Sequence, residues 1–181
     1  MNRFQMNLKA LCLGLLTIAP LSVSAGEFAQ LGYGRLINND FLGDGKDRWR
    51  TGSYDFSVTF GDEVTDGLPE VAFALMQYRL RAEILAPESL SKPVAFPDRP
   101  YAGVIGLGAF THFKKGAVNI SYGAELNFVG PATGLGRFQD WAHDAIGAQR
   151  PKVLADQLPD RIYPTIQGEF SRDVRLGNTL V

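Results

Sequence analysis

The side chains of this chain that could do chemistry are polar and fall in four places. They are Asn39-Asp40, Asp47-Arg48-Trp49-Arg50-Thr51-Gly52, Asp98-Arg99-Pro100-Tyr101-Ala102-Gly103, and the pair Gln139 and His143. Carboxylate and amide oxygens are ligands that a hard cation such as Ca²⁺ prefers. A lone histidine can act as a general base, and arginine can bind a phosphate group. Together these parts suit the hydrolysis of an ester on a phosphorylated substrate.

Each of these parts also has an ordinary structural interpretation. Asn39-Asp40, followed by Asp44-Gly45, fits a turn between strands, because Asn, Asp and Gly dominate turns. The acids of this stretch do not have the spacing of an EF-hand loop. His143 alone fits a surface or packing histidine, and Asp98-Arg99 fits an ordinary charged pair before a strand. The function of these residues therefore depends on the elements that position them.

The first 25 residues predict an export signal. Arg3 and Lys9 give a positive start, residues 10–19 are apolar, and Val23-Ser24-Ala25 is a run of small residues. The apolar stretch is well short of the ~20 residues that a membrane-spanning helix needs. We therefore expect a cleaved signal peptide over residues 1–25.

Composition narrows the classes of protein further. Cys12 is the only cysteine and lies in the signal, so the mature chain has no disulfide, cysteine nucleophile or thiolate metal site. Without Arg3 and Lys9 the 18 basic side chains become 16 against 19 acidic ones, a net charge of -3. This balance gives no indication of nucleic-acid binding. The length of residues 26–181 suits one domain.

The elements that carry the polar clusters are mainly strands. Polar and apolar residues alternate with the period of two that a strand requires over 53–60, 77–84 and 118–128. Further candidates are 28–38, 101–113 and 162–172, the last leading into a turn at Gly177-Asn178. With a stub at the end of the chain, the pattern predicts seven strands.

Alternation alone fits both a soluble sandwich and a membrane barrel. The polar face contains Gly106, Gly108 and Gly123 beside Asn, Ser and paired charges, which suits a narrow polar lumen. Aromatic residues recur near the ends of the strands, as the interfacial girdle of a barrel requires. No apolar run approaches a transmembrane helix, so an exported chain would cross a membrane only by closing a sheet. We predict an all-β, antiparallel transmembrane β-barrel of the outer-membrane type.

One segment, near 135–146, predicts a short loop helix instead of a strand. Its apolar residues have helical spacing, and Gly147 is suited to end the helix. Phe138 and Trp141 would rest on the barrel wall or contact acyl chains. Gln139 and His143 are four residues apart and therefore share one face of the helix.

In their order along the chain, these motifs resemble one family, the outer-membrane lipid A deacylases that remove the acyl group at the 3'-position. The family is a group of calcium-dependent hydrolases that modify the lipopolysaccharide anchor. The similarity spans nearly all of the mature chain, and residues 98–103 are its most distinctive stretch. Asp156-Gln157-Leu158-Pro159 resembles a later family stretch.

The resemblance implies a catalytic mechanism like that of secreted phospholipases. His143 is the expected general base that takes a proton from water. Ca²⁺, held by Asn39 and Asp40, is the expected cofactor that polarises the ester carbonyl and stabilises the oxyanion. Thr51 is expected to help hold the metal, the water or the ester.

The resemblance also implies a partner, the lipid A of lipopolysaccharide in outer-membrane lipid. Arg99, by its position in the motif, and Lys46 or Arg48, by charge alone, are expected to bind a phosphate of the substrate. Gln139, which shares the helical face of His143, is expected to contribute to substrate binding. Bacterial export through the signal peptide to the outer membrane follows from the same resemblance.

Two other functions remain open from the residues alone. A serine-dependent esterase has no Gly-x-Ser-x-Gly motif to support it, although Ser53, Ser57 or Ser121 could face His143 across a barrel. A small outer-membrane barrel could instead act as an inactive pore or binding protein. Metal-dependent ester release would distinguish the deacylase from this barrel.

The length of the chain departs from the family pattern. Members of the family have roughly twice this mature length and a barrel of about twelve strands, whereas bacterial barrels have even strand numbers. The terminal residues, from Gly177 to Val181, also lack the final aromatic expected of an outer-membrane barrel. We therefore expect the N-terminal part of the family's barrel, either truncated or completed by another chain, which leaves the activity of this chain alone open.

Overall fold

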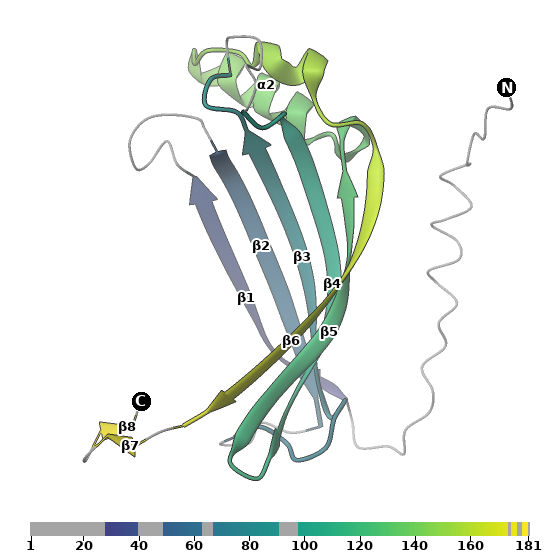
Figure 1. Ribbon diagram of the computed structural model, residues 1–181, viewed down its shortest axis with the longest axis vertical. Coiled ribbons are helices and arrows are strands. Elements are labelled where there is room, and N and C mark those ends of the chain that lie inside the picture. Colours follow the sequence, from purple (N-terminus) through teal and green to yellow (C-terminus); the bar gives the residue numbers. More distant parts are fainter. Residues whose placement is uncertain are drawn as a thin grey trace, which may run out of the picture.

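The computed structural model describes residues 28–39, 49–62, 67–90, 98–173, 175–176 and 179–180. Their main feature is an antiparallel sheet in which each strand pairs with the next one along the chain, in the order β1-β2-β3-β4-β5-β6 (Figure 1). The strands are β1 (Ala29–Asn39), β2 (Trp49–Gly61), β3 (Leu75–Ala86), β4 (Ala102–Lys115), β5 (Val118–Val129) and β6 (Arg161–Arg172). A separate pair of two-residue strands, β7 (Arg175–Leu176) and β8 (Thr179–Leu180), follows β6.

The six long strands confirm the antiparallel sheet predicted from the alternating pattern. The expected stub is different, because among the described residues it is the pair β7 and β8 and not a seventh strand of the main sheet. The expected turn at Gly177-Asn178 and the expected signal peptide at 1–25 lie outside the described residues. Within the described part of the chain, no helix has the length and hydrophobicity needed to span a membrane.

The two faces of the sheet differ in polarity. Residues that pair across strands lie on the same face, so Ser57 and Arg79 share one face, whereas the neighbouring pair, Val58 and Tyr78, shares the other. The same division continues across the sheet, with polar rows next to apolar rows. Large apolar side chains are exposed on the second face, including Tyr78 and Leu107. One apolar face and one polar face are what a barrel wall between lipid and lumen requires.

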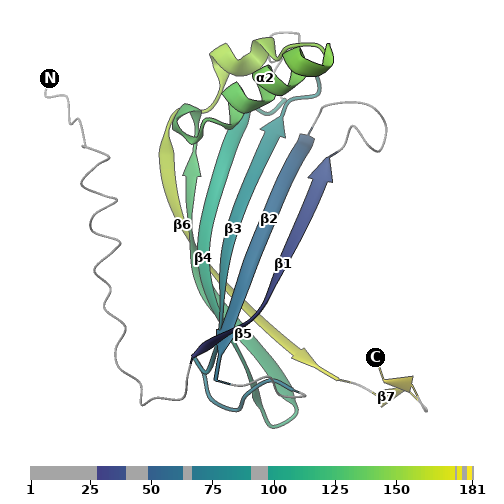
Figure 2. The same ribbon diagram turned by 180° about the vertical axis from the view of Figure 1, so that it is seen from behind.

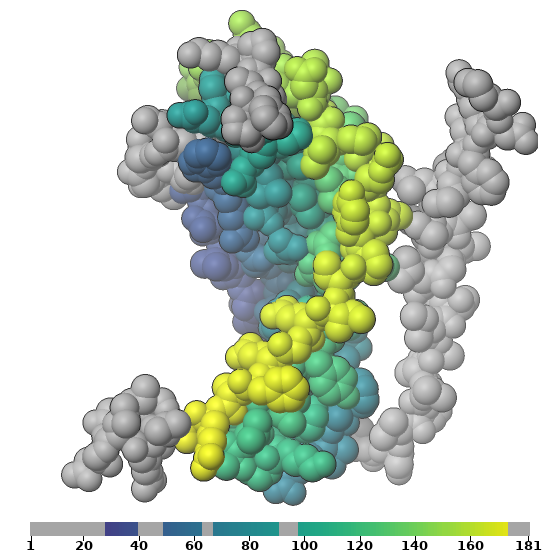
Figure 3. All heavy atoms as spheres, viewed as in Figure 1, coloured from purple at the N-terminus to yellow at the C-terminus, as the bar shows by residue number. Residues whose placement is uncertain are grey.

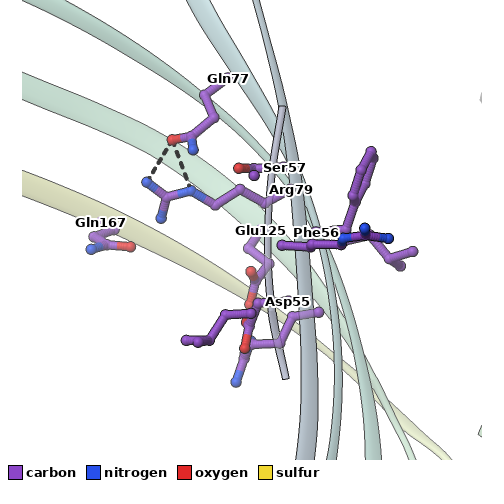
Figure 4. Close-up of a pocket in the computed structure, with 12 residues that line it drawn as sticks. Asp55, Phe56, Ser57, Gln77, Arg79, Glu125 and Gln167 are labelled. Atoms are coloured by element: carbon purple, nitrogen blue, oxygen red, sulfur yellow. Dashed lines mark hydrogen bonds and ion pairs between the residues drawn. The ribbon is translucent and has the colours of Figure 1, made fainter. Parts of the chain in front are cut away.

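The sheet curves strongly around its polar face. Gly34 of β1 and Gln167 of β6, on the two edge strands, line the same cavity of about 480 Å³. Asp55, Ser57 and Arg79 lie around this cavity (Figure 4). In the space-filling view the side chains of β6, in yellow, run diagonally across the front of the molecule (Figure 3). The polar face is therefore the inside of the curve, as the sequence predicts for a lumen.

Charged side chains cross the inside of the curved sheet, and a glycine makes room for them. A β-carbon on Gly106 would lie 2.8 Å from the carboxylate of Glu125. That carboxylate pairs with Arg81 Nη2 at 2.7 Å, and the same nitrogen donates to Asn127 Oδ1 at 2.8 Å. Arg81 Nη1 also pairs with Glu83 Oε2 at 2.6 Å. Arg81, Glu83 and Glu125 thus all have charged partners, which is the condition for a stable polar interior.

A helical cap lies at one end of the strands (Figures 1 and 2). It contains the helix α2 (Leu135–Ile146), between the 3₁₀ helices η3 (Pro131–Thr133) and η4 (Lys152–Asp156). Gly134 and Gly147 flank α2 with φ values of 75° and 69°, a left-handed conformation that glycine adopts without strain. The helix predicted near 135–146 is therefore confirmed.

The buried apolar core lies in this cap and at the adjoining strand ends. Its buried members are Ile84, Ala86, Leu90, Tyr101 and Val153, and Leu135 and Leu154 pack against them. These residues come from the end of β3, the connection to β4, α2 and η4. The core therefore fixes α2 to the rim of the sheet.

Candidate functional site

A pocket of about 630 Å³ lies between α2 and the adjoining ends of β1, β2 and β3. Four of the residues predicted to form the site line it: Asn39, Thr51, Gln139 and His143. The remaining polar residues of its lining are Asn38, Ser53 and Glu83. Its apolar lining includes Ile37, Tyr54, Phe138 and Ile146. The structure thus brings together side chains from four separate elements of the chain, β1, β2, β3 and α2.

The register of β1 and β2 places Asn39 and Thr51 at the rim. Asn39 is the last residue of β1 and pairs with Gly52, and a β-carbon on Gly52 would lie 3.6 Å from Asn39 Nδ2. The pairing of β2 with β3 shifts between Arg50 and Gly52, so Thr51 is the extra residue of a β-bulge. Bulges change the direction of a side chain and are frequent beside functional sites. The Thr51 side chain is buried, with 2% exposure.

His143 is buried on α2, and its orientation is set by the chain that follows the helix. Its Nδ1 lies 2.6 Å from the carbonyl oxygen of Gln149. Because a carbonyl can only accept, Nδ1 carries the proton, and in the neutral ring the lone pair is on Nε2. The left-handed conformation of Gly147 turns the chain back, so that Ala148 N donates to the carbonyl oxygen of His143 at 2.8 Å. This arrangement gives His143 the tautomer that a base at Nε2 needs.

The distinctive motif at residues 98–103 contacts α2 and the segment that follows η4. Tyr101 is fully buried and its hydroxyl donates to Gln139 Oε1 at 2.8 Å. Its carbonyl oxygen accepts from Leu158 N at 2.8 Å, which connects the motif to the segment after η4. A β-carbon on Gly103 would lie only 2.6 Å from Thr133 Oγ1. Sequence reasoning missed this role of Tyr101, since the contact with Gln139 joins residues that are distant in the chain.

Glu83 and Ser53 also line the pocket, although Glu83 was not among the predicted site residues and Ser53 was considered only as a possible serine nucleophile. Glu83 is 8% exposed, and its carboxylate oxygens pair with Arg50 Nε and Arg81 Nη1, each at 2.6 Å. Ser53 pairs with Glu83 across the strands, and within the described residues its buried Oγ has no hydrogen-bond partner. The sequence signal for Glu83 was its position on the polar face of a strand.

Ser53 is also the one serine, of the three considered as nucleophiles, that lines the pocket with His143. Ser57 lines the cavity inside the curved sheet, and Ser121 pairs with His112 on β4. A serine nucleophile normally has a hydrogen bond to its base. Ser53 Oγ makes no such bond in the described part of the chain.

The predicted basic and acidic residues are not all in this pocket. Asp40, Lys46 and Arg48 lie outside the described residues. Arg99 is exposed and does not line the pocket. Its guanidinium lies 5.0 Å from the ring centroid of Trp49, a cation–π arrangement. Trp49 begins β2 with a φ of 61°, which is unusual for a residue with a side chain and is a local strain at the rim.

The exposed side of α2 carries an ion pair. Arg150 Nε donates to Asp140 Oδ1 at 2.7 Å, and Arg150 also pairs with Asp140 Oδ2. The hydrogen bond from Arg150 is the main cause that lowers the pKa of Asp140, and the charges of Arg150 and His143 act in the same direction. Across the described residues, no three His, Cys, Asp or Glu side chains lie close enough to hold a metal ion.

Comparison with known proteins gives two matches. A family model described as "Outer membrane protein LpxR" matches residues 10–180. The solved structure of LpxR from Salmonella typhimurium is similar to this structure, with a TM-score of 0.66 and 20% sequence identity. The similarity covers 80% of this chain and 52% of that chain, so this chain spans about half the length of that relative. No curated protein matches the chain.

Proposed function

Because the chain belongs to the LpxR family of outer membrane proteins, we propose that it hydrolyses the ester-linked acyl group at the 3'-position of lipid A. The observation that carries the proposal is the rim pocket, where Asn39, Thr51, Gln139 and His143 meet from β1, β2 and α2. These four residues come from three of the sequence motifs, and only the fold brings them together. The pocket combines a buried base with oxygen donors, which is the combination that hydrolysis of an ester needs.

His143 is the general base in this proposal. Its Nδ1 is held by the Gln149 carbonyl at 2.6 Å, so Nε2 is the atom that takes a proton from water. The oxygen of that water attacks the carbonyl carbon of the ester. Nε2 then gives its proton to the leaving alkoxide as the bond between the carbonyl carbon and that oxygen breaks. The products are a free fatty acid and a hydroxyl on the remaining lipid, and the histidine returns to its neutral form.

The donor set of the pocket fits calcium. Asn39 offers an amide oxygen and Thr51 offers a hydroxyl oxygen, both hard ligands of the kind that Ca²⁺ prefers. Asn39 and Asp40 would hold the ion, which would supply positive charge to polarise the ester carbonyl. Asp40 lies outside the described residues, so the proposed ligand set rests on the motif at this position.

The apolar lining of the pocket supports a lipid substrate. Ile37 and Tyr54 come from the apolar face of the sheet, and Phe138 and Ile146 come from α2. An acyl chain can lie against these side chains while its ester reaches His143. Gln139, in the same pocket, would contact the substrate beside the ester. The candidates that would bind phosphate groups of the substrate are Arg99, together with Arg48 and Lys46, which lie outside the described residues.

The test is mass spectrometry of lipid A from cells that produce this chain. We expect loss of the 3'-linked acyl group, and we expect His143→Ala and calcium chelation each to prevent it. His112→Ala is the matched control, because His112 is the other of the two histidines and bonds to Gln77 inside the curved sheet, away from the pocket. Unchanged lipid A, with the protein present in the outer membrane, would contradict the proposal and favour an inactive barrel.

A further inference from the structure

Three kinds of side chain divide the surface of α2. Gly136, Gln139 and His143 form a buried face, which is polar apart from the glycine. A second face carries charged residues, Arg137, Asp140 and Asp144. The third face is apolar and contains Phe138, Trp141 and Ala145, with Ile146 at its edge. Because residues three and four apart lie on one side of a helix, each set forms a continuous stripe.

The apolar stripe is exposed although the polar stripe is buried. Phe138, Trp141 and Ile146 are 58%, 65% and 71% exposed. The rings of Phe138 and Trp141 lie 5.8 Å apart and form a single aromatic patch. A surface helix of a protein in water has the reverse arrangement, with its apolar stripe toward the core. The reversed arrangement indicates an apolar surrounding on the outer side of α2.

The apolar stripe of α2 continues onto the apolar face of the sheet. Phe138 and Ile146 share the rim pocket with Ile37 of β1 and Tyr54 of β2. Ile37 and Tyr54 pair across the strands, so both lie on the face opposite the polar interior. In an outer membrane protein this face of the strands contacts lipid. The apolar face of the strands therefore adjoins the apolar stripe of α2 at this pocket.

We propose that Phe138, Trp141 and Ile146 form a membrane-contacting surface that lies among the acyl chains of the outer-membrane lipid. Tryptophan is suited to the boundary between headgroups and acyl chains, and an interfacial helix buries its apolar face ~5–10 Å below that boundary. The charged stripe with Arg137 and Asp144 then lies toward the headgroups and water. The opening of the rim pocket lies at the level where acyl chains begin, so a lipid enters it from the side.

Tryptophan fluorescence tests this proposal, because the chain has only two tryptophans. Trp49→Phe keeps an aromatic ring beside Arg99 and leaves Trp141 as the reporter. The protein is placed in phosphatidylcholine vesicles with bromine on the acyl chains, or in micelles of brominated dodecyl maltoside. Bromine quenches tryptophan only on contact. We expect loss of most of the Trp141 emission relative to the unbrominated lipid or detergent.

A matched reporter on the charged stripe makes the test specific. In a Trp49→Phe, Trp141→Phe background, Asp144→Trp puts the single tryptophan on the neighbouring face of the same helix. We expect iodide in water to quench this reporter and bromine to leave its emission largely unchanged. Equal quenching of the Trp141 and Asp144→Trp reporters by iodide, with no effect of bromine on either, would overturn the proposal. The measurement does not depend on ester hydrolysis, so it can succeed where the deacylase proposal fails.

Discussion

Removal of one buried hydroxyl, by Tyr101→Phe, tests whether the motif at residues 98–103 acts through α2. Tyr101 has no exposed surface, and its hydroxyl donates to Gln139 Oε1 at 2.8 Å. The phenylalanine keeps the ring in the core and removes only this donor. Gln139 is 5% exposed, so water cannot easily replace the lost hydrogen bond. Gln139 shares its helical face with His143, so any movement that relieves its buried amide also moves the proposed base, His143.

The size of the effect follows from the cost of a buried polar group that loses its partner, about 1–3 kcal/mol. If this whole cost is expressed in the transition state, kcat/KM for deacylation falls roughly 5- to 150-fold. The part that is not expressed there lowers the free energy of unfolding instead. We therefore expect the two losses together to reach about 1–3 kcal/mol.

The assay combines kcat/KM, from fatty acid released from lipid A, with urea unfolding of the same samples. A double-mutant cycle with Gln139→Met isolates the bond, and the two substitutions should be less than additive because they remove the same contact. Tyr122→Phe is the control, since Tyr122 lies on the apolar face and within the described residues its hydroxyl makes no hydrogen bond. An unchanged kcat/KM and pH profile in Tyr101→Phe, or full additivity in the cycle, would refute a positioning role for Tyr101.

Three further predictions concern stability, pH and the nucleophile. Gly103→Ala puts a carbon 2.6 Å from the hydroxyl oxygen of Thr133 in η3, so we expect the free energy of unfolding in urea to fall by about 1–3 kcal/mol. Gly32→Ala is the control, because its new carbon meets no atom within 4 Å and should leave the stability unchanged. Arg150 lowers the pKa of Asp140 below its usual 3.8. The stability from this pair is therefore present above pH 3.8 and is lost as the pH falls through the lowered pKa. The difference in unfolding midpoint between wild type and Arg150→Gln should shrink only in that acid range. Ser53→Ala removes a buried hydroxyl with no hydrogen-bond partner among the described residues, so we expect an unchanged or higher free energy of unfolding and retained deacylation. A loss of deacylation as complete as that of His143→Ala would instead indicate a serine nucleophile.

The sequence predicts the strands well because each one separates two different surroundings. Alternation in segments such as 53–60 reflects a polar interior and an apolar exterior, and it can be detected without information on long-range contacts. The helix was equally visible, since Leu135–Ile146 changes to helical spacing and is flanked by Gly134 and Gly147. The two-residue strands β7 and β8 are too short to give a pattern of their own.

The pocket was predictable only in part. Spacing places Gln139 and His143 on one helical face, but their meeting with Asn39 and Thr51 depends on how α2 lies on the rim. That placement rests on core contacts and on the hydrogen bond from Tyr101 to Gln139, two residues that are 38 positions apart. Glu83 was missed, and Ser53 was considered only as one of three possible serine nucleophiles, for a related reason. Alternation assigns each of them to a face of the sheet but does not indicate which row of that face reaches the rim.

The distance along the chain between the parts of the pocket determines when the site can exist. Asn39 and His143, which line the same pocket, are 104 residues apart, counted from 39 to 143. Contacts between residues so far apart form late, because the entropy of closing the intervening chain must be overcome first. The pocket also needs β1, β2 and β3 already in register and α2 already seated on them. A chain that has not yet folded in the outer membrane therefore has no assembled pocket, and the proposed hydrolysis can begin only after the sheet and α2 have come together there.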